Sequence, residues 1–243
     1  MSTYIVIPVR LASTRFPNKA LHKVDGVPLV QHLFTELNKL GHPVSVACAR
    51  KDVRTLLNET DLVDIIPTAD NCNNGTERVA DAAKQLKANN DDLFVNVQCD
   101  QFLIDTSIIK RAIDYFNVAD KKDVISNVKC LSLMCEEPVT HRSINTVKVV
   151  TNVHNEALYF SRNIIPVTKE RKAPLKQKTH IGIYLYSYLM LDWYIHSLRT
   201  PNERIEDLEQ LRFLEQGMTI SMMPIERKQK PISINYIEDT EII

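Results

Sequence analysis

A run of cationic and hydroxyl side chains follows the first apolar stretch of the chain. That stretch, IVIPV, ends at Val9, and Arg10, Ser13, Arg15 and Lys19 all lie within the next ten residues. Guanidinium and ammonium groups beside a hydroxyl can bind a polyphosphate through charge-assisted hydrogen bonds. A solvated surface loop explains these four residues equally well when they are taken alone. The chain contains neither the G-x-G-x-x-G nor the Walker motif, so a polyphosphate would have to bind without a glycine-rich loop.

The segment NNGTERVAD, residues 73–81, has the composition of a helix start. Gly75 permits backbone angles that other residues avoid, and Thr76 can cap the helix. The free N–H groups of such a helix start can face a base or an anion. An ordinary helix cap is the simpler interpretation of this segment by itself.

The segment VNVQCDQF, residues 95–102, places polar groups at the end of an apolar strand. Gln98 and Asp100 follow the strand directly. A carboxylate near a polyphosphate suits Mg²⁺, which binds one or two carboxylates together with substrate oxygens. As an isolated residue, Asp100 is weak evidence for such a site.

Strands and helices alternate through the first half of the sequence. Strands are predicted at 4–9, 43–49, 63–67 and 93–98, and helices at 27–41, from 52, at 75–86 and at 106–116. This order is typical of a parallel sheet with crossover helices, in which ligands bind outside the carboxyl ends of the strands. The loop that begins at Arg10 lies at such an end, and so does Asp100.

Beyond residue 120 the pattern changes. Residues 145–162 predict two strands around an Asn-Val-His-Asn turn, and 179–189 predict a strand with aromatic residues at alternate positions. One helix is predicted over 203–217, with Ile205, Leu208, Leu211 and Leu214 facing inward, before a strand at 219–225 and a short C-terminal helix. These segments predict a second, smaller lobe.

The composition limits the classes of function. Of the 243 residues, 30 are basic and 30 acidic, so no net field favours nucleic acid or an anionic membrane. No apolar segment approaches the roughly 18 residues of a membrane span, and the N-terminus lacks the features of a signal peptide. The five cysteines form no C-x-x-C pair, which argues against a disulfide framework and a zinc site. We therefore expect a cytoplasmic protein with reduced thiols and no membrane insertion.

Together, the three segments resemble one enzyme family. IVIPVRLASTRFPNKAL, NGTERVAD and FVNVQCDQ, in this order and at these separations, are similar to the bacterial cytidylyltransferases that make CMP-3-deoxy-manno-octulosonate. The later segments YFSRNIIP, HIGIYLYSY and LEQLR agree with that resemblance, which covers nearly the whole chain. It implies a Rossmann-like α/β nucleotidyltransferase fold with a mostly parallel, mixed central sheet flanked by helices, and a homodimer.

The same resemblance implies how the chain is organised and what it does. A single domain over 1–243 would bind the nucleotide mainly through 1–120 and would bind the sugar and dimerise mainly through 121–217, while 218–243 return to the active site. The anomeric hydroxyl of an eight-carbon sugar acid would attack the α-phosphorus of CTP in the presence of Mg²⁺, releasing pyrophosphate. The product would serve lipopolysaccharide or capsule biosynthesis.

The resemblance also implies roles for individual residues. Arg10, Ser13, Arg15 and Lys19 would hold the triphosphate, and the cytidine side would be formed by Asn74, Gly75, Thr76, Glu77 and Arg78. The sugar would be surrounded by Gln98, Arg162, His180, Tyr184, Glu209 and Gln210. Asp100 and Asn235 would hold Mg²⁺, and Arg10, Lys19 and Asp100 would carry catalysis. Without the resemblance, Tyr184 is better explained as a core aromatic, and Glu209 with Gln210 as the solvated side of a helix.

The chain departs from the family pattern mainly around the metal. Cys99, Asp100, Gln101 and Phe102 stand where the family has Gly-Asp-Glu-Pro, and Asn235 replaces an aspartate that is the second metal ligand. An asparagine oxygen binds a hard cation without adding negative charge, so we expect weaker metal binding. In the first loop, Asn18 replaces a glycine, and asparagine tolerates the left-handed backbone conformation better than most residues.

Three functions remain open on the sequence. The first is an active cytidylyltransferase for 3-deoxy-manno-octulosonate or a close ulosonic-acid variant, such as an 8-amino form. The second is a synthetase for CMP-activated nine-carbon, sialic-type acids, against which YFSR and LEQLR argue. The third is a paralogue that binds nucleotide or sugar but has lost catalysis, for which Asn235 and Cys99 are the reason.

Overall fold

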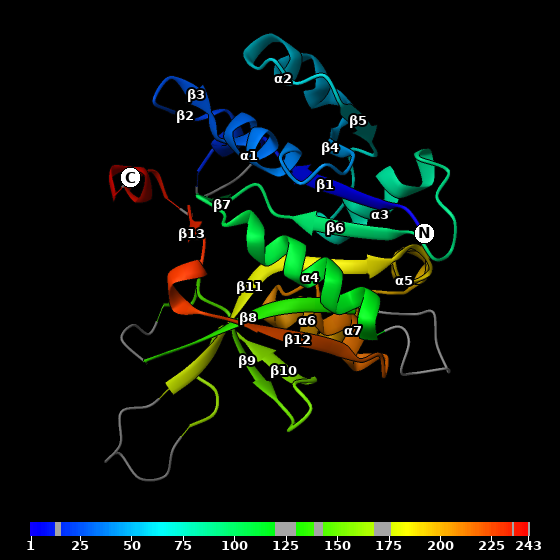
Figure 1. Ribbon diagram of the computed structural model, residues 1–243, viewed down its shortest axis with the longest axis vertical. Helices are drawn as coiled ribbons and strands as arrows, with labels where there is room; N and C mark the ends of the chain where they lie inside the picture. The colour runs from blue at the N-terminus through cyan, green and yellow to red at the C-terminus, as the bar shows by residue number, and fades with distance from the viewer. Residues whose placement is uncertain (13–15, 120–129, 139–142, 168–175, 235, 243) are drawn as a thin grey trace.

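The computed structural model describes residues 1–12, 16–119, 130–138, 143–167, 176–234 and 236–242. Three residues with predicted roles, Ser13, Arg15 and Asn235, lie outside the described residues. Figure 1 shows the α/β units of the first half in the upper part of the view and the β9–β10 hairpin, residues 148–161, at the lower end. Within the described residues, no helix is both long enough and apolar enough to cross a membrane.

A central sheet organises the molecule. Its strands in the described residues are β1 (Thr3–Val9), β4 (Val44–Ala49), β5 (Ile65–Thr68), β6 (Leu93–Val97), β8 (Cys130–Pro138), β9 (Lys148–Thr151), β10 (Ala157–Ser161), β11 (Lys176–Ser187) and β12 (Ile220–Ile225). The order is β10-β9-β11-β6-β1-β4-β5, with β8 paired to β11 and β12 paired to β8. The neighbours β6, β1, β4 and β5 are parallel, whereas β11 is antiparallel to β6. This arrangement confirms the predicted mixed, mostly parallel central sheet.

Two hydrophobic cores lie on opposite faces of this sheet. Ile5 and Ile7 of β1 share one core with α1 (Leu29–Asn38), α2 (Val53–Glu59) and α4 (Thr106–Ala119). Val6, pointing the other way, shares the second core with α3 (Gly75–Gln85) and α5 (Tyr188–His196). Because both faces of β1 are covered, its sequence is a continuous apolar run rather than an alternating one.

Short elements connect these units. The 3-10 helix η1 (Lys19–Leu21) follows the first loop, the hairpin of β2 (Lys23–Val24) and β3 (Val27–Pro28) leads into α1, and η2 (Arg50–Asp52) leads into α2. The predicted strands and helices of the first half are all present, with ends shifted by a few residues.

β11 joins the two halves of the chain. Its last five residues, 183–187, pair with β6, and β8 pairs along almost its full length, with a shift of register between Ile181 and Tyr184. The strand predicted over 179–189 and the hairpin predicted over 145–162 are therefore confirmed. The sequence analysis predicted no strand at β8, although β8 links β11 to β12.

The single helix predicted over 203–217 is wrong. The structure has two short helices, α6 (Pro201–Glu206) and α7 (Leu211–Glu215), separated by a turn in which Asp207 is left-handed with φ 50°. Ile205, predicted to face inward, is 80% exposed, whereas Leu208 and Leu211 are buried. The break turns Glu209 and Gln210 out of a helical surface and toward the interior.

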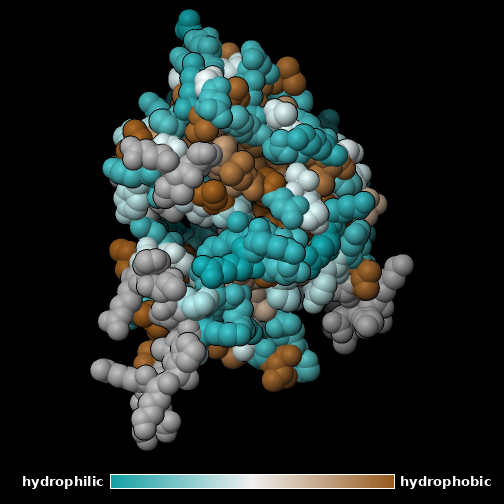
Figure 2. Space-filling model, turned by 60° about the vertical axis from the view of Figure 1, so that its left-hand side comes forward, coloured by the Kyte–Doolittle hydropathy of each residue, from teal (hydrophilic) through white to brown (hydrophobic). Residues whose placement is uncertain are grey.

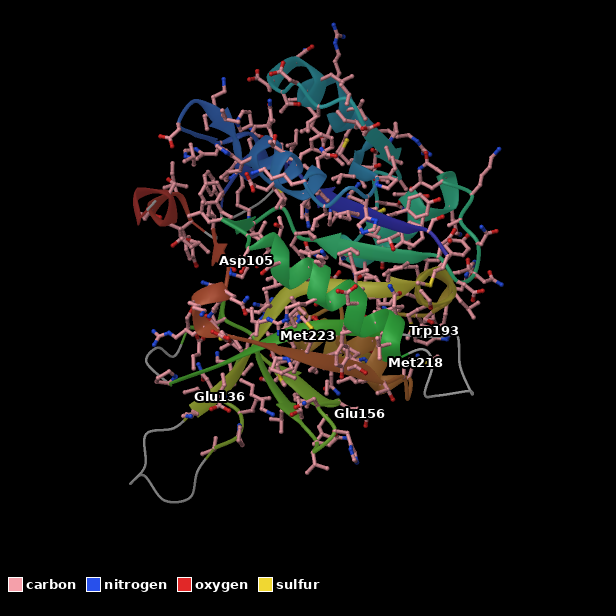
Figure 3. The ribbon with its side chains drawn as sticks, viewed as in Figure 1. Asp105, Glu136, Glu156, Trp193, Met218 and Met223 are labelled. Carbon is pink, nitrogen blue, oxygen red and sulfur yellow. The ribbon has the colours of Figure 1, made fainter. Side chains whose placement is uncertain are left out.

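The C-terminal segment returns to the first half. After β12 and the 3-10 helix η3 (Arg227–Gln229), the strand β13 (Ile232–Ser233) pairs antiparallel with β7 (Gln101–Phe102), and η4 (Ile237–Ile242) follows. Gln229 Nε2 donates to Asp105 Oδ2 at 3.2 Å, which attaches η3 to the start of α4 (Figure 3). Residues far apart in sequence therefore lie beside the end of β6.

Candidate functional site

A cleft of about 620 Å³ opens where β1 and β6 end. The arrows of both strands point to the left in Figure 1, and Figure 2, which brings that side forward, shows hydrophilic side chains across the middle of the face. Predicted site residues from both halves line the cleft: Arg10, Asn74, Gly75, Gln98, Asp100, Arg162, His180, Tyr184, Glu209 and Gln210. The fold thus brings together most of the residues that the sequence assigned to nucleotide, metal and sugar.

The predicted triphosphate residues begin at the end of β1. Arg10 follows β1 directly and is exposed on the wall of the cleft. Asn18 has φ 55°, so this position does use the left-handed conformation that asparagine was expected to tolerate. Lys19 comes next, and its ammonium group points at Asp100, with Nζ 3.2 Å from Oδ2.

Asp100 is held by donors on both of its carboxylate oxygens. Lys19 Nζ donates to Oδ2, and Gln101 Nε2 donates to Oδ1 at 2.9 Å. The neighbouring Cys99 adds no charge, because burial raises the pKa of its thiol to about 12. The described part of the chain contains no group of three or more His, Cys, Asp or Glu side chains that could hold a metal. A lone carboxylate facing a cleft fits Mg²⁺, which completes its coordination with substrate oxygens and water.

Gly75 is used for a different reason than the one predicted. It has no positive φ; instead, a Cβ at this position would collide with the side-chain amide of Gln98. The residue that caps α3 is Asn74, whose Oδ1 accepts from Glu77 N at 2.8 Å, and the expectation of a Thr76 cap is wrong. The glycine therefore allows Gln98 to lie directly against the start of α3.

Three residues predicted for the cytidine side do not line the cleft. Thr76 is buried, with its hydroxyl 2.8 Å from Tyr186 Oη. The Glu77 carboxylate turns to Arg212, at 2.9 Å. Arg78 is buried and donates to Thr68 Oγ1 at 2.5 Å. In this structure all three support the start of α3, and of the five residues predicted for the cytidine side Asn74 and Gly75 line the cleft.

The end of the cleft that carries the predicted sugar-binding residues has an aromatic wall. The His180 ring packs against Phe160 and Tyr184, at 5.2 Å between ring centroids in each case, and its Nε2 lies 2.8 Å from Ser132 Oγ. Burial lowers the pKa of the His180 imidazole to about 3, so the ring is neutral near pH 7. Tyr184 donates from its hydroxyl to Gln210 Oε1 at 3.1 Å. This leaves Gln210 Nε2 buried and without a partner among the described residues.

Glu209 lies between the two halves, inside the turn that breaks the predicted helix. Its Oε2 accepts from Thr76 N at 2.9 Å and its Oε1 accepts from Gln98 Nε2 at 3.3 Å. Burial raises the pKa of the Glu209 carboxyl to about 7, although the bond from Thr76 works against that rise. The alternative interpretation of Glu209 and Gln210, as the solvated side of a helix, is therefore wrong, and both line the cleft.

Arg162 lines the cleft but already makes several bonds. Its Nε donates to Glu206 O at 2.6 Å, its Nη2 to Asp207 O at 2.9 Å and its Nη1 to Ile144 O at 3.2 Å. These bonds cap the end of α6, so the guanidinium is held rigidly. Two of its five N–H groups remain for a ligand.

A largely buried ionic cluster beside the cleft was missed by the sequence analysis. Arg212, 2% exposed, bonds both oxygens of Glu203 at 2.6 and 2.8 Å, reaches Glu77 at 2.9 Å and lies over the Tyr194 ring at 4.0 Å. Arg199 Nε contacts the same Glu203 at 3.2 Å. LEQLR contains Arg212, but nothing in the local pattern shows that its partners come from α3 and α6. The cluster fastens the start of α3 to the turn that carries Glu209.

Replacing Glu209 with glutamine is expected to change how stability depends on pH. The pKa of the Glu209 carboxyl is about 7 in the folded protein, against an ordinary value of 4.5. Between these two pH values the folded protein therefore keeps a proton that the unfolded chain has lost. The stability that this group contributes is full below pH 4.5 and is lost as pH rises through 7. The melting temperature of Glu209→Gln minus that of the wild type should therefore rise between about pH 5 and about pH 8 and then level off.

Thermal unfolding across that range measures this difference. Glu59→Gln, at the exposed end of α2, is the control for the loss of a carboxylate outside the cleft. A pH-independent difference for Glu209→Gln would contradict the raised pKa.

Comparisons with known proteins agree with this geometry. A family model described as "Cytidylyltransferase" matches residues 4–220. The 3-deoxy-manno-octulosonate cytidylyltransferase 2 of Hydrogenovibrio crunogenus is 36% identical over 227 residues, covering 93% of this chain and 91% of that protein. The corresponding enzyme of Nitratiruptor sp. is 33% identical over 245 residues, covering 98% of this chain and 97% of that protein.

Solved structures give the same result. A CMP:2-keto-3-deoxy-manno-octonic acid synthetase, solved in complex with CTP, superposes with a TM-score of 0.83 and 26% identity, covering 100% of this chain and 96% of the other. A cytidylyltransferase from Leptospira borgpetersenii shares the fold, with a TM-score of 0.60, 18% identity and coverage of 99% and 84%. The chain belongs to the cytidylyltransferase family, in the branch of the 3-deoxy-manno-octulosonate cytidylyltransferases.

Proposed function

We propose that this chain couples CTP to 3-deoxy-manno-octulosonate, or to a close variant such as the 8-amino form, giving the CMP-sugar and pyrophosphate. The observation that carries the proposal is that one cleft is lined by Arg10 and Asp100 from one half and by His180, Tyr184 and Gln210 from the other. A nucleotide bound at the Arg10 end of the cleft and a sugar bound at the His180 end would meet in the middle of the cleft. The relatives named for this reaction, and the relative solved with CTP, support the assignment.

The chain's own residues would act mainly by positioning and charge neutralisation, which supply most of the catalysis in phosphoryl transfer. Arg10 and Lys19 would bind the triphosphate, and the remaining N–H groups of Arg162 would bind the sugar carboxylate. Neutral His180, the Gln210 amide and the Glu209 carboxyl would orient the sugar hydroxyls. Bound Mg²⁺, held by Asp100 and Asn235, would neutralise charge on the phosphates.

Pyrophosphate release with CTP, Mg²⁺ and a panel of sugar acids tests the proposal. The panel contains 3-deoxy-manno-octulosonate, its 8-amino form and a nine-carbon sialic-type acid, and turnover is expected with one of the first two. Turnover with the nine-carbon acid alone would replace the proposal with a sialic-type synthetase. CTP binding without turnover on any sugar would leave a catalytically impaired paralogue, the alternative that Asn235 favours.

Asn235→Asp is expected to strengthen Mg²⁺ binding, because a second carboxylate adds charge to a site that has one. The Mg²⁺ concentration giving half the maximal rate should fall about tenfold, equivalent to about 1.4 kcal/mol. A titration of rate against Mg²⁺ measures this. Asn58→Asp, on exposed α2, controls for charge alone. An unchanged Mg²⁺ requirement would show that residue 235 does not contribute to the metal site.

We further propose a cytoplasmic homodimer that supplies lipopolysaccharide or capsule synthesis. The five free thiols fit a reducing compartment. Val153 and Leu158 of the β9–β10 hairpin are 92% and 60% exposed, and burial against a second copy would remove that apolar surface from water. Light scattering after size-exclusion chromatography distinguishes a dimer from a monomer.

A further inference from the structure

We propose that the Lys19 ammonium occupies the place of the divalent cation in the free protein, and that the cation site includes, beside Asp100 Oδ2, the main-chain carbonyl oxygen of Ile234. The inference rests on the proposed role of Mg²⁺ at Asp100. It adds a ligand, the Ile234 carbonyl, and it makes the lysine and the metal alternatives for the same two oxygens.

The first step is the position of the ammonium. Lys19 Nζ lies 3.2 Å from Asp100 Oδ2 and 2.9 Å from Ile234 O, so it bridges a carboxylate and a carbonyl. The Lys19 and Asp100 side chains are only 18% and 29% exposed, so neither charge is fully solvated. One positive charge is thus already held between two oxygens of the kind that Mg²⁺ prefers.

The second step concerns which oxygens are open to a cation. Gln101 is 5% exposed, and its Nε2 donates to Asp100 Oδ1 at 2.9 Å and to Ser233 Oγ at 3.2 Å. The bond from Gln101 occupies Asp100 Oδ1 and leaves Oδ2 facing Lys19. The amide at 101 therefore acts as a positioning residue for the carboxylate.

The third step is the rigidity of the carbonyl. Ile234 N donates to Asp100 O at 3.0 Å, next to the ladder between β13 and β7. The Ile234 side chain is fully buried and packs with Phe16, Leu29 and Phe102. The carbonyl is therefore fixed beside Asp100 by the same contacts that return the C-terminal segment to the first half.

Lys19 and the metal therefore compete for the same two oxygens, and a bound nucleotide removes that competition. Two cations cannot share the same pair of oxygens without strong repulsion, so the metal binds only when Lys19 leaves. A triphosphate in the cleft gives Lys19 another anion to bind. Metal and nucleotide therefore favour each other's binding, and the metal alone binds weakly.

The test uses Mn²⁺ alone, without CTP or sugar, and measures binding from the electron paramagnetic resonance signal of the free ion. Wild type should bind Mn²⁺ weakly, and Lys19→Met should bind one ion at least tenfold more tightly. Lys19→Arg keeps the charge and should bind as weakly as wild type. Lys23→Met, an exposed residue of β2 outside the cleft, should also match wild type.

Two further measurements locate the ion. In the Lys19→Met background, Asp100→Asn should abolish the tight site, and crystals soaked in Mn²⁺ should show anomalous density between Asp100 and Ile234 O. Equal affinity in wild type and Lys19→Met, or an ion bound away from Ile234, would overturn the inference. Because no substrate is present, these outcomes are independent of whether the chain turns over CTP, so failure of the proposed function is recognised separately.

Discussion

Replacing Asp100 with asparagine should lower kcat for CMP-sugar formation by about 10²- to 10³-fold, the usual loss when one preorganised charge-stabilising group is removed. Asparagine keeps the size of the side chain but removes the negative charge that would hold the metal against the phosphates. Pyrophosphate release at saturating CTP and sugar measures the change. The melting temperature should move little, because the bond to Lys19 is partly exposed and contributes at most about 1 kcal/mol.

Asp114→Asn is the matched control. Asp114 lies on the exposed side of α4, away from the cleft, and the same substitution there should leave kcat unchanged. Normal turnover by Asp100→Asn would remove Asp100 from the metal site and from catalysis. A large fall in melting temperature would instead show that the variant loses activity through its fold.

Replacing Arg212 with methionine should destabilise the protein by about 3–5 kcal/mol, because it removes the buried cation that two carboxylates share. Glu203 is 1% exposed and Glu77 is 15% exposed, and both bond this one guanidinium. Although burial by itself lowers it, hydrogen bonds to Glu203 raise the pKa of Arg212 above its ordinary value. For a chain of this size the melting temperature should fall by roughly 6–20 °C.

Arg199→Met separates this effect from the loss of any arginine near Glu203. Arg199 contacts Glu203 only through Nε, and its side chain is about one-third exposed, so its removal should cost no more than about 1 kcal/mol. Adding Glu203→Gln to Arg212→Met should recover part of the lost stability, since it removes a buried negative charge that has lost its bidentate partner. A melting temperature of Arg212→Met close to that of wild type would mean that the cluster is not stabilising.

The part of the fold that local sequence patterns encode was predictable. Periods of two and of about 3.6 residues distinguish strands from helices, so the α/β units of the first half and the 145–162 hairpin appear where predicted. The backbone conformation of the first loop was also predictable at one position, because Asn18 adopts the left-handed conformation that asparagine tolerates. The cleft-lining Arg10 and Asp100 were found because polar residues at the ends of buried strands are conspicuous.

The rest depends on contacts between distant residues. The apolar spacing over 203–217 continues through Asp207, but Arg162, some 45 residues away, donates to Asp207 O and Glu206 O and stabilises a break there. The same spacing would leave Glu209 on a solvated surface, whereas the broken helix turns it inward, where its carboxylate accepts from Thr76 N. Gly75 could be recognised as special from the sequence, but its close approach to Gln98 could not.

The division of β11 into two pairing segments sets a limit on protein engineering. The strand pairs with β8 on both sides of its register shift and with β9 at Thr179, but only residues 183–187 pair with β6, and Tyr186 bonds Thr76 from there. A chimera joined near residue 120, meant to exchange sugar preference between relatives, would take Tyr186, the partner of Thr76, from the other protein. A junction at Gly182 would exchange His180 while keeping Tyr186, so recombination of this family should respect the strand's own boundary rather than the midpoint of the chain.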